Sequence, residues 1–202
     1  MTKTAEAEKV TYLTAVDCDG PIAETPKRTD WGRRFSKLGL KPRHDAIEGI
    51  SFLQSQPDVN LAGIYTARPG ILHKEQTRRQ LKRWGIPVDR VVHTSNSSLK
   101  KVKIFLSEVH KARQEDENVQ GVLIDDNEAR IVNATQRIIA KDPVLGPVAQ
   151  EALTIVVFDS QKTGEQRTGG ADCTIGPRVI YMKDWSKKHR ENAFREIRTS
   201  TA

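Results

Sequence analysis

The stretch Val10-Thr11-Tyr12-Leu13-Thr14-Ala15-Val16-Asp17-Cys18-Asp19-Gly20 decides the fold of this chain. Its first seven residues are β-branched, aromatic or aliphatic, a composition typical of a buried strand. Gly20 and the following proline then break the strand. Asp17 and Asp19 therefore lie at the carboxyl end of a strand, where open α/β sheets bind their ligands. Strand alternation directs these two carboxylates to one side and Cys18 to the other, where we expect the thiol to pack in the core.

Predicted strands and helices alternate along the rest of the chain. Strands are predicted at 61–65, 88–93, 119–124, 153–158 and 178–182, and helices at 45–54, 72–84, 98–112, 128–140 and 185–198. Ile47, Ile50 and Leu53 are expected to form the apolar face of the first of these helices. A short helix is expected near 30–38, and loops are expected at 142–147 and 161–172. This alternation implies βαβ units and a mainly parallel sheet of the α/β class.

Length and composition indicate one globular domain. The chain has 202 residues, of which 37% are hydrophobic and 29% charged, enough for a sizeable core under a polar surface. Residues 1–9 lack the apolar core of a signal peptide, so we expect a flexible leader followed by a single domain at 10–202. No apolar run approaches the roughly 20 residues of a membrane helix. Two cysteines in a chain of this size favour a reducing compartment, so a cytoplasmic location without membrane association is expected.

The net charge of +7 has two interpretations. A basic surface attracts polyanions and phosphorylated ligands, but it is also common on ordinary soluble proteins. Basic residues gather in the segments 73–83 and 183–198, which either contact a nucleic-acid backbone or form solvated helix faces. Aromatic residues make up 5% of the chain, and no stacking platform for single strands is evident.

Polar residues of complementary chemistry follow four successive strands. They are Asp17 and Asp19, then Thr66 and Arg68, then Lys100, Lys101 and Lys103 at the start of a helix, and finally Asp125 and Asp126. The carboxyl ends of parallel strands share one edge of the sheet, so these residues can converge despite their separation in sequence.

This set of residues suits phosphoryl transfer. The transition state spreads negative charge over the phosphoryl oxygens, and positioned cations stabilise that charge. Carboxylates from the first and fourth strands can bind Mg²⁺, which prefers oxygen ligands. One carboxylate can attack phosphorus while a second transfers protons.

In these motifs the chain resembles the haloacid dehalogenase (HAD) superfamily of phosphotransferases, over about residues 10–133. The resemblance implies a Rossmann-like three-layer α/β/α sandwich. It implies that Asp17 is the nucleophile and that Asp19 is the general acid/base, with its main chain on Mg²⁺. Thr66 would bind the phosphate, and Asp125 and Asp126 would complete the metal site.

The resemblance also requires one lysine that binds phosphate. Lys100 and Lys101 stand at the expected helix start and Lys103 lies one turn in; spacing does not choose among them, and Lys100 or Lys101 is favoured.

The segment Thr66-Ala67-Arg68, taken with the later Asp-Asp pair, resembles the phosphatase half of polynucleotide kinase/phosphatase enzymes. In that context Arg68 helps to bind the phosphate, for which a guanidinium is well suited. The alternative is that Arg68 is simply exposed in a turn before Pro69.

HAD enzymes usually select substrates with inserted cap domains, and only residues 20–44 are available for a cap here. The resemblance therefore implies a minimal or absent cap and an open site for a bulky phosphorylated substrate, such as nucleic-acid ends or a phosphoprotein. Trp31, Arg33 and Arg34 are candidates to border the entrance, although Trp31 is equally suited to packing.

The predicted function is a Mg²⁺-dependent phosphomonoester hydrolase that acts through an aspartyl-phosphate. Two alternatives are a polynucleotide-end phosphatase in nucleic-acid repair and a non-catalytic protein that binds phosphate or nucleic acid.

Overall fold

A six-stranded sheet forms the centre of the computed structural model, which describes residues 9–24, 41–68, 71–86, 88–95, 97–158 and 177–199. The strands are β1 (Thr11–Asp17), β2 (Val59–Thr66), β3 (Val91–His93), β4 (Val119–Asp125), β5 (Leu153–Phe158) and β6 (Arg178–Met182). They lie in the order β3-β2-β1-β4-β5-β6, and every pairing is parallel. β3 is shorter than predicted because only Ile64–Thr66 of β2 pair with it.

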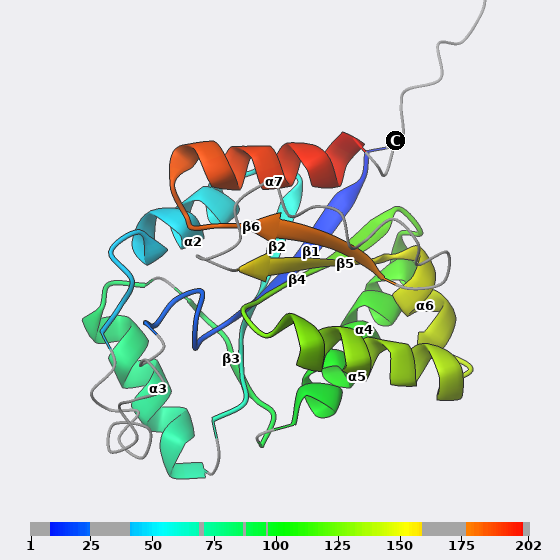
Figure 1. The fold of residues 1–202 in the computed structure, drawn as a ribbon, viewed down its shortest axis with the longest axis horizontal. Coiled ribbons are helices and arrows are strands. Elements are labelled where there is room, and N and C mark those ends of the chain that lie inside the picture. The colour runs from blue at the N-terminus through cyan, green and yellow to red at the C-terminus, as the bar shows by residue number, and fades with distance from the viewer. Residues whose placement is uncertain are drawn as a thin grey trace, which may run out of the picture.

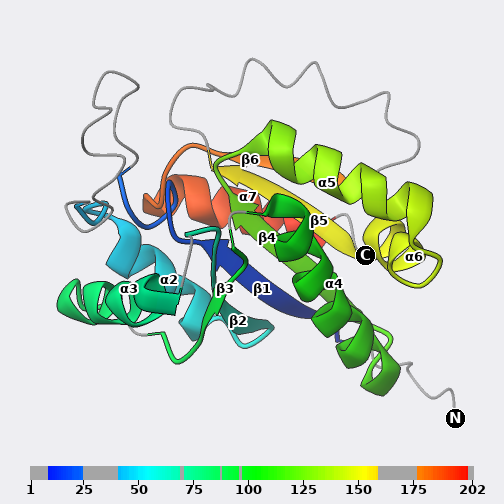
Figure 2. The ribbon, with the colours of Figure 1, turned by 90° about the horizontal axis from the view of Figure 1, so that it is seen from below.

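Helices cover both faces of this sheet. They are α2 (Ala46–Ser55), α3 (Ile71–Arg83), α4 (Ser98–Glu115), α5 (Glu128–Lys141), α6 (Leu145–Glu151) and α7 (Lys187–Thr199). Apolar residues of α2, α3 and α7 share one core cluster with the sheet, and those of α4, α5 and α6 share another. Figures 1 and 2 show α2 and α7 on one side of the sheet and α4, α5 and α6 on the other. The predicted three-layer α/β/α architecture is confirmed.

The predicted loop at 142–147 is wrong, because α6 begins at Leu145. The Asp142 side chain accepts hydrogen bonds from the backbone N–H of Val144 at 3.3 Å and of Leu145 at 3.1 Å. Pro147 is the third residue of the helix, in the first turn, where a missing N–H has no consequence for the helix ladder. Leu145 and Val148 are buried in the second core cluster. This packing stabilises a helix that the local Gly-Pro sequence does not predict.

The predicted apolar face of α2 is also partly wrong. Ile47 is 42% exposed, whereas Gly49, Ile50 and Leu53 are buried. A Cβ at Gly49 would lie 2.2 Å from Cδ2 of Trp185. The absent side chain therefore lets the indole approach the helix, and this contact turns Ile47 toward solvent.

Several predictions fall outside the described residues. They concern the leader (all but residue 9), the short helix at 30–38, Trp31, Arg33 and Arg34 in the 20–44 segment, and the loop at 161–172. Within the described part, Cys18 is fully buried in the first core cluster, as predicted. None of the described helices is both long and apolar enough to cross a bilayer.

Candidate active site

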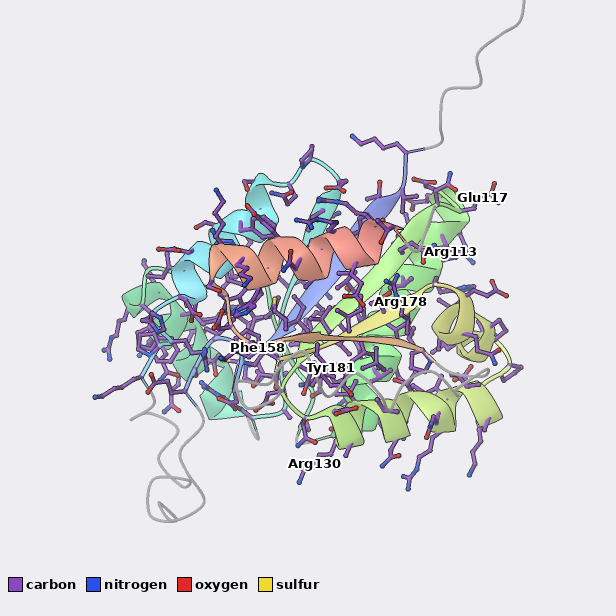
Figure 3. The ribbon with its side chains drawn as sticks, turned by 45° about the horizontal axis from the view of Figure 1, so that its top comes forward. Arg113, Glu117, Arg130, Phe158, Arg178 and Tyr181 are labelled. Carbon is purple, nitrogen blue, oxygen red and sulfur yellow. The ribbon has the colours of Figure 1, made fainter. Side chains whose placement is uncertain are left out.

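The candidate residues meet at the carboxyl edge of the sheet because β1 lies between β2 and β4. Asp17 is in register with Tyr65 of β2, which places Thr66 one residue further along, and Val16 is in register with Ile124, which places Asp125 level with Asp17. In Figure 3 this edge faces left: Phe158, at the carboxyl end of β5, lies there, while Arg113 and Glu117 lie at the far end of α4.

Three carboxylates form a cluster at this edge. Asp17, Asp125 and Asp126 each offer one oxygen, and these oxygens all lie within 4.8 Å of one another. Asp17 is 7% exposed and Asp125 is 2% exposed, while Asp126 is partly exposed. Acidic residues from opposite halves of the described chain are thus brought together, as the strand pattern predicts.

Lys101 is the lysine that reaches this cluster. Its Nζ lies 2.9 Å from Oδ1 of Asp17 and 2.7 Å from Oδ2 of Asp125, and the residue is 2% exposed. Lys100 is exposed, and the exposed Lys103 pairs with Asp142 at 3.2 Å.

The sequence carries a signal that distinguishes these lysines. Val102, Phe105, Leu106 and Val109 form the buried face of α4 together with Lys101. Side chains four residues apart share a helix face. Lys101 therefore lies on the same buried face as Phe105, whereas Lys100 and Lys103 lie on the exposed side of α4.

The cluster carries more negative than positive charge. Burial raises the pKa of Asp17 well above 3.8, an effect that Lys101 opposes and Asp125 reinforces. Burial and the charge of Asp125 raise the pKa of Asp126 to about 6. Burial by itself would lower the pKa of Lys101, but Asp17 and Asp125 outweigh it and raise that pKa. Three carboxylates sharing one lysine form a site that a divalent cation would neutralise.

The residues present fit a hard divalent ion such as Mg²⁺. The donors are carboxylate oxygens, the ligands that Mg²⁺ prefers. Gly20 has φ of +99°, and a Cβ there would lie 2.3 Å from Cγ of Asp126. Only glycine both adopts this backbone conformation and leaves room for the Asp126 carboxylate beside the turn.

Backbone amides fix two of the carboxylates. Oδ1 of Asp17 accepts a hydrogen bond from the N–H of Cys18 at 2.8 Å, and Oδ1 of Asp125 accepts one from the N–H of Asn127 at 2.8 Å. The Asn127 side chain also caps the N-terminus of α5. Oδ1 of Asp17 therefore receives two contacts, one from the N–H of Cys18 and one from Nζ of Lys101.

Thr66 lies fully buried at the end of β2. Its Oγ1 accepts a hydrogen bond from the N–H of Arg68 at 3.2 Å, so the hydroxyl proton is not used in that bond. Its carbonyl accepts from the N–H of Thr94 at 3.0 Å and from the Thr94 hydroxyl at 3.2 Å. These bonds hold the segment Thr66-Ala67-Arg68 against the strand end.

Asp19 and Arg68 form an ion pair beside the cluster. Nη2 of Arg68 lies 2.6 Å from Oδ1 of Asp19, and Arg68 is 2% exposed. The interpretation of Arg68 as an exposed turn residue is therefore wrong. Burial lowers the pKa of Arg68, but Cys18 and Asp19 outweigh it and raise that pKa.

Sequence reasoning missed the residues that support the site. The indole Nε1 of Trp185 donates to the carbonyl of Pro21 at 2.7 Å, and its backbone N–H donates to Oδ2 of Asp45 at 2.8 Å. These bonds tie the loop after β6 to the turn that follows Asp17 and Asp19. The signal was a tryptophan, costly to leave exposed, at the start of a predicted helix and three residues after a predicted strand.

The comparisons with known proteins identify no family. No protein-family profile matches the chain, and none of the curated proteins matches it in sequence. Among solved structures, the HAD domain of the effector protein Lem4 from Legionella pneumophila is similar to 95% of this chain over 95% of its own, at 12% identity and a TM-score of 0.43. A likeness at this level carries no information on activity, so any function has to be inferred from the residues at the strand ends.

Proposed function

We propose that this protein is a Mg²⁺-dependent phosphomonoester hydrolase of the HAD type that acts through an aspartyl-phosphate. One observation carries the proposal: the buried Lys101 lies between Asp17 and Asp125 at 2.9 and 2.7 Å, with Asp126 beside them. A structural ion pair needs one carboxylate for one lysine. A third carboxylate at this edge favours a site that binds a cation and a phosphoester.

In the first half-reaction Asp17 attacks the phosphorus atom. An oxygen–phosphorus bond forms to its carboxylate while the bond between phosphorus and the leaving oxygen breaks. Asp19, in its protonated form, gives its proton to that leaving oxygen. Lys101 and the Thr66 hydroxyl stabilise the charge on the phosphoryl oxygens.

In the second half-reaction Asp19, now a carboxylate, removes a proton from water. The water oxygen attacks phosphorus, and the bond between phosphorus and Asp17 breaks, which releases inorganic phosphate and restores both carboxyl groups. Asp17, Asp125 and Asp126, with the main chain of Asp19, would hold the metal. When bound, Mg²⁺ supplies further positive charge at the phosphoryl oxygens.

A paired assay tests this proposal. Wild-type protein is expected to hydrolyse 4-nitrophenyl phosphate with Mg²⁺ and to stop when EDTA is added. Asp17→Asn should abolish turnover, whereas Asp89→Asn, a change of an exposed aspartate, should not. Acid-quenched wild type should carry one phosphoryl group that hydroxylamine removes. Full activity in Asp17→Asn would exclude the mechanism, and an absence of any hydrolysis in the wild type would favour a non-catalytic binding protein.

A polynucleotide end is the second candidate, as a narrower choice of substrate. α3 exposes Arg78, Arg79, Lys82 and Arg83, and the same helix contacts Arg68 through Thr77 and Gln80. A basic helix that adjoins the site in this way suits a phosphate backbone whose terminal phosphate lies at Asp17.

Salt dependence tests this candidate. A 3′-phosphorylated oligonucleotide should exceed a nucleoside 3′-monophosphate and a phosphopeptide in kcat/KM, with an advantage that falls between 50 and 200 mM salt. Arg79→Ala should reduce that advantage, and Arg137→Ala, an exposed change on α5 across the sheet, should not. Equal rates on all three substrates at both salt concentrations would remove the candidate.

A further inference from the structure

Arg68 uses most of its hydrogen-bonding capacity within the protein. Its Nε donates to both oxygens of Asp19, at 3.1 Å to Oδ1 and 3.3 Å to Oδ2, and Nη2 donates to Oδ1 at 2.6 Å. Its Nη1 donates to the Thr77 hydroxyl at 3.4 Å and to Oε1 of Gln80 at 2.7 Å. Since a guanidinium has five N–H groups, only one, on Nη2, lacks a partner among these bonds.

The helix α3 holds the far side of this guanidinium. Thr77 is 1% exposed, and it lies three residues before Gln80, so both side chains lie on one face of α3. The guanidinium plane is thereby fixed between the helix and Asp19. A planar fork held on two sides orients a carboxylate more strictly than a lysine can.

The contacts also distinguish the two oxygens of Asp19. Of the bonds from Arg68, Oδ1 receives those from Nη2 at 2.6 Å and Nε at 3.1 Å, whereas Oδ2 receives one from Nε at 3.3 Å. The guanidinium thus holds the carboxylate mainly through Oδ1, and this contact fixes the direction of Oδ2. The Asp19 side chain is 23% exposed, so a substrate and water can reach it.

These contacts favour a role for Arg68 other than the phosphate binding that the resemblance to polynucleotide phosphatases implies. A residue that grips a phosphate needs donors directed at the ligand. Here Asp19, Thr77 and Gln80 take four of the five N–H groups.

We propose that Arg68 is a positioning residue, which orients Asp19 for proton transfer to the leaving oxygen and is itself held by Thr77 and Gln80. The proposal rests on the phosphatase function above. It predicts that the loss of activity on changing Arg68 depends on the leaving group. An acidic phenol leaves as its anion without a proton, whereas an alcohol must be protonated as it leaves.

The test compares kcat/KM for two substrates, because this parameter reports the steps up to departure of the leaving group. Arg68→Gln should lose about 100-fold on glycerol 2-phosphate and less than about 5-fold on 4-nitrophenyl phosphate, with the loss in kcat rather than KM. The double variant Arg68→Gln with Asp19→Asn should have the same kcat/KM as Asp19→Asn alone. Arg68→Lys should stay defective on the alkyl phosphate, because charge alone does not restore the fork.

A second pair of variants avoids the risk that a change of buried Arg68 prevents folding. Gln80→Leu removes one support of the guanidinium, and it should show the same leaving-group trend at a smaller size. Gln76→Leu, one turn earlier on α3 and without a described bond to Arg68, is the matched control and should behave as wild type.

Two results would overturn the positioning role. One is an Arg68→Gln loss that is equal on both substrates, raises KM and adds to that of Asp19→Asn, which is the result for a phosphate grip. The other is Gln80→Leu indistinguishable from Gln76→Leu. Neither result resembles a failure of the phosphatase proposal, which would appear as retained turnover in Asp17→Asn or no turnover in the wild type.

Discussion

Replacing Asp126 with asparagine should make the metal-free protein more stable. Burial and the neighbouring carboxylates raise the pKa of Asp126 from 3.8 to about 6. At about 1.4 kcal/mol for each tenfold change in protonation, the charged form costs the folded state about 3 kcal/mol at pH 7. Asp126 is partly exposed, so solvent screening reduces this figure, and we expect Asp126→Asn to raise the free energy of unfolding by about 1 to 2 kcal/mol.

The gain should depend on pH in a defined direction. Because the pKa of Asp126 is higher in the folded state than in the unfolded chain, folding takes up protons between pH 6 and pH 4. The wild type therefore becomes more stable, relative to the variant, as pH falls through this window. At pH 4.5 about two thirds of the difference seen at pH 7 should have disappeared.

Mg²⁺ should reverse the order of stabilities. An ion at one hundred times its Kd stabilises the wild type by about 2.7 kcal/mol, and a variant that lacks one ligand gains less. Urea unfolding at pH 7 with EDTA, at pH 4.5 with EDTA, and at pH 7 with Mg²⁺ measures all three effects.

The exposed Asp89→Asn is the control for charge, and it should change stability by less than about 0.5 kcal/mol in each buffer. If Asp126→Asn is no more stable than the wild type in EDTA at pH 7, burial and the neighbouring charges do not raise the pKa of Asp126 as described. If it is more stable but Mg²⁺ does not reverse the order, the cluster is not a metal site.

Three further changes test separate parts of the structure. Lys101→Met should cost about 3 to 5 kcal/mol in EDTA, because it leaves buried carboxylates unpaired, and should abolish turnover, whereas the exposed Lys100→Met should do neither; similar activities in the two variants would refute the assignment. Gly49→Ala forces a methyl group against Trp185, and urea unfolding should show a loss of about 1 to 3 kcal/mol. Asn127→Ala removes the cap of α5 and should cost about 1 kcal/mol by the same measurement; an unchanged midpoint would show that the cap contributes nothing.

The sequence predicts the sheet well because its strands are short apolar runs that end in polar residues. In a parallel sheet such runs are buried on both faces, so the pattern is strong and the bounds of β5 and β6 follow directly from it. The convergence of Asp17 with Asp125 follows from the same rule, since neighbouring parallel strands end at one edge.

The errors come from packing contacts that local propensity does not include. α6 forms because Leu145 and Val148 pack on α4 and α5, although the local Gly-Pro pair favours a turn. Ile47 points outward because the Trp185 indole packs against α2 at Gly49, which has no side chain. Trp185 lies far from Ile47 in sequence, whereas α5 directly precedes α6, so only the error at Ile47 comes from a distant partner.

The burial of Arg68 could not be predicted for a related reason. A turn before a proline is usually exposed, and the burial of its guanidinium requires Thr77 and Gln80 to lie on the correct face of α3. The burial of Lys101, in contrast, can be predicted from sequence, because Lys101 lies on the same face of α4 as its apolar residues.

The bond from Trp185 to Pro21 has a consequence for synthesis of the chain. It joins residues 164 positions apart, so the turn after Asp17 and Asp19 lacks this anchor until residue 185 has left the ribosome. A nascent chain halted before residue 185 should carry the acidic residues of β1 and β4 but hold them in a loosely ordered turn. The geometry of the acidic cluster should then become fixed only after residue 185 has folded back onto Pro21.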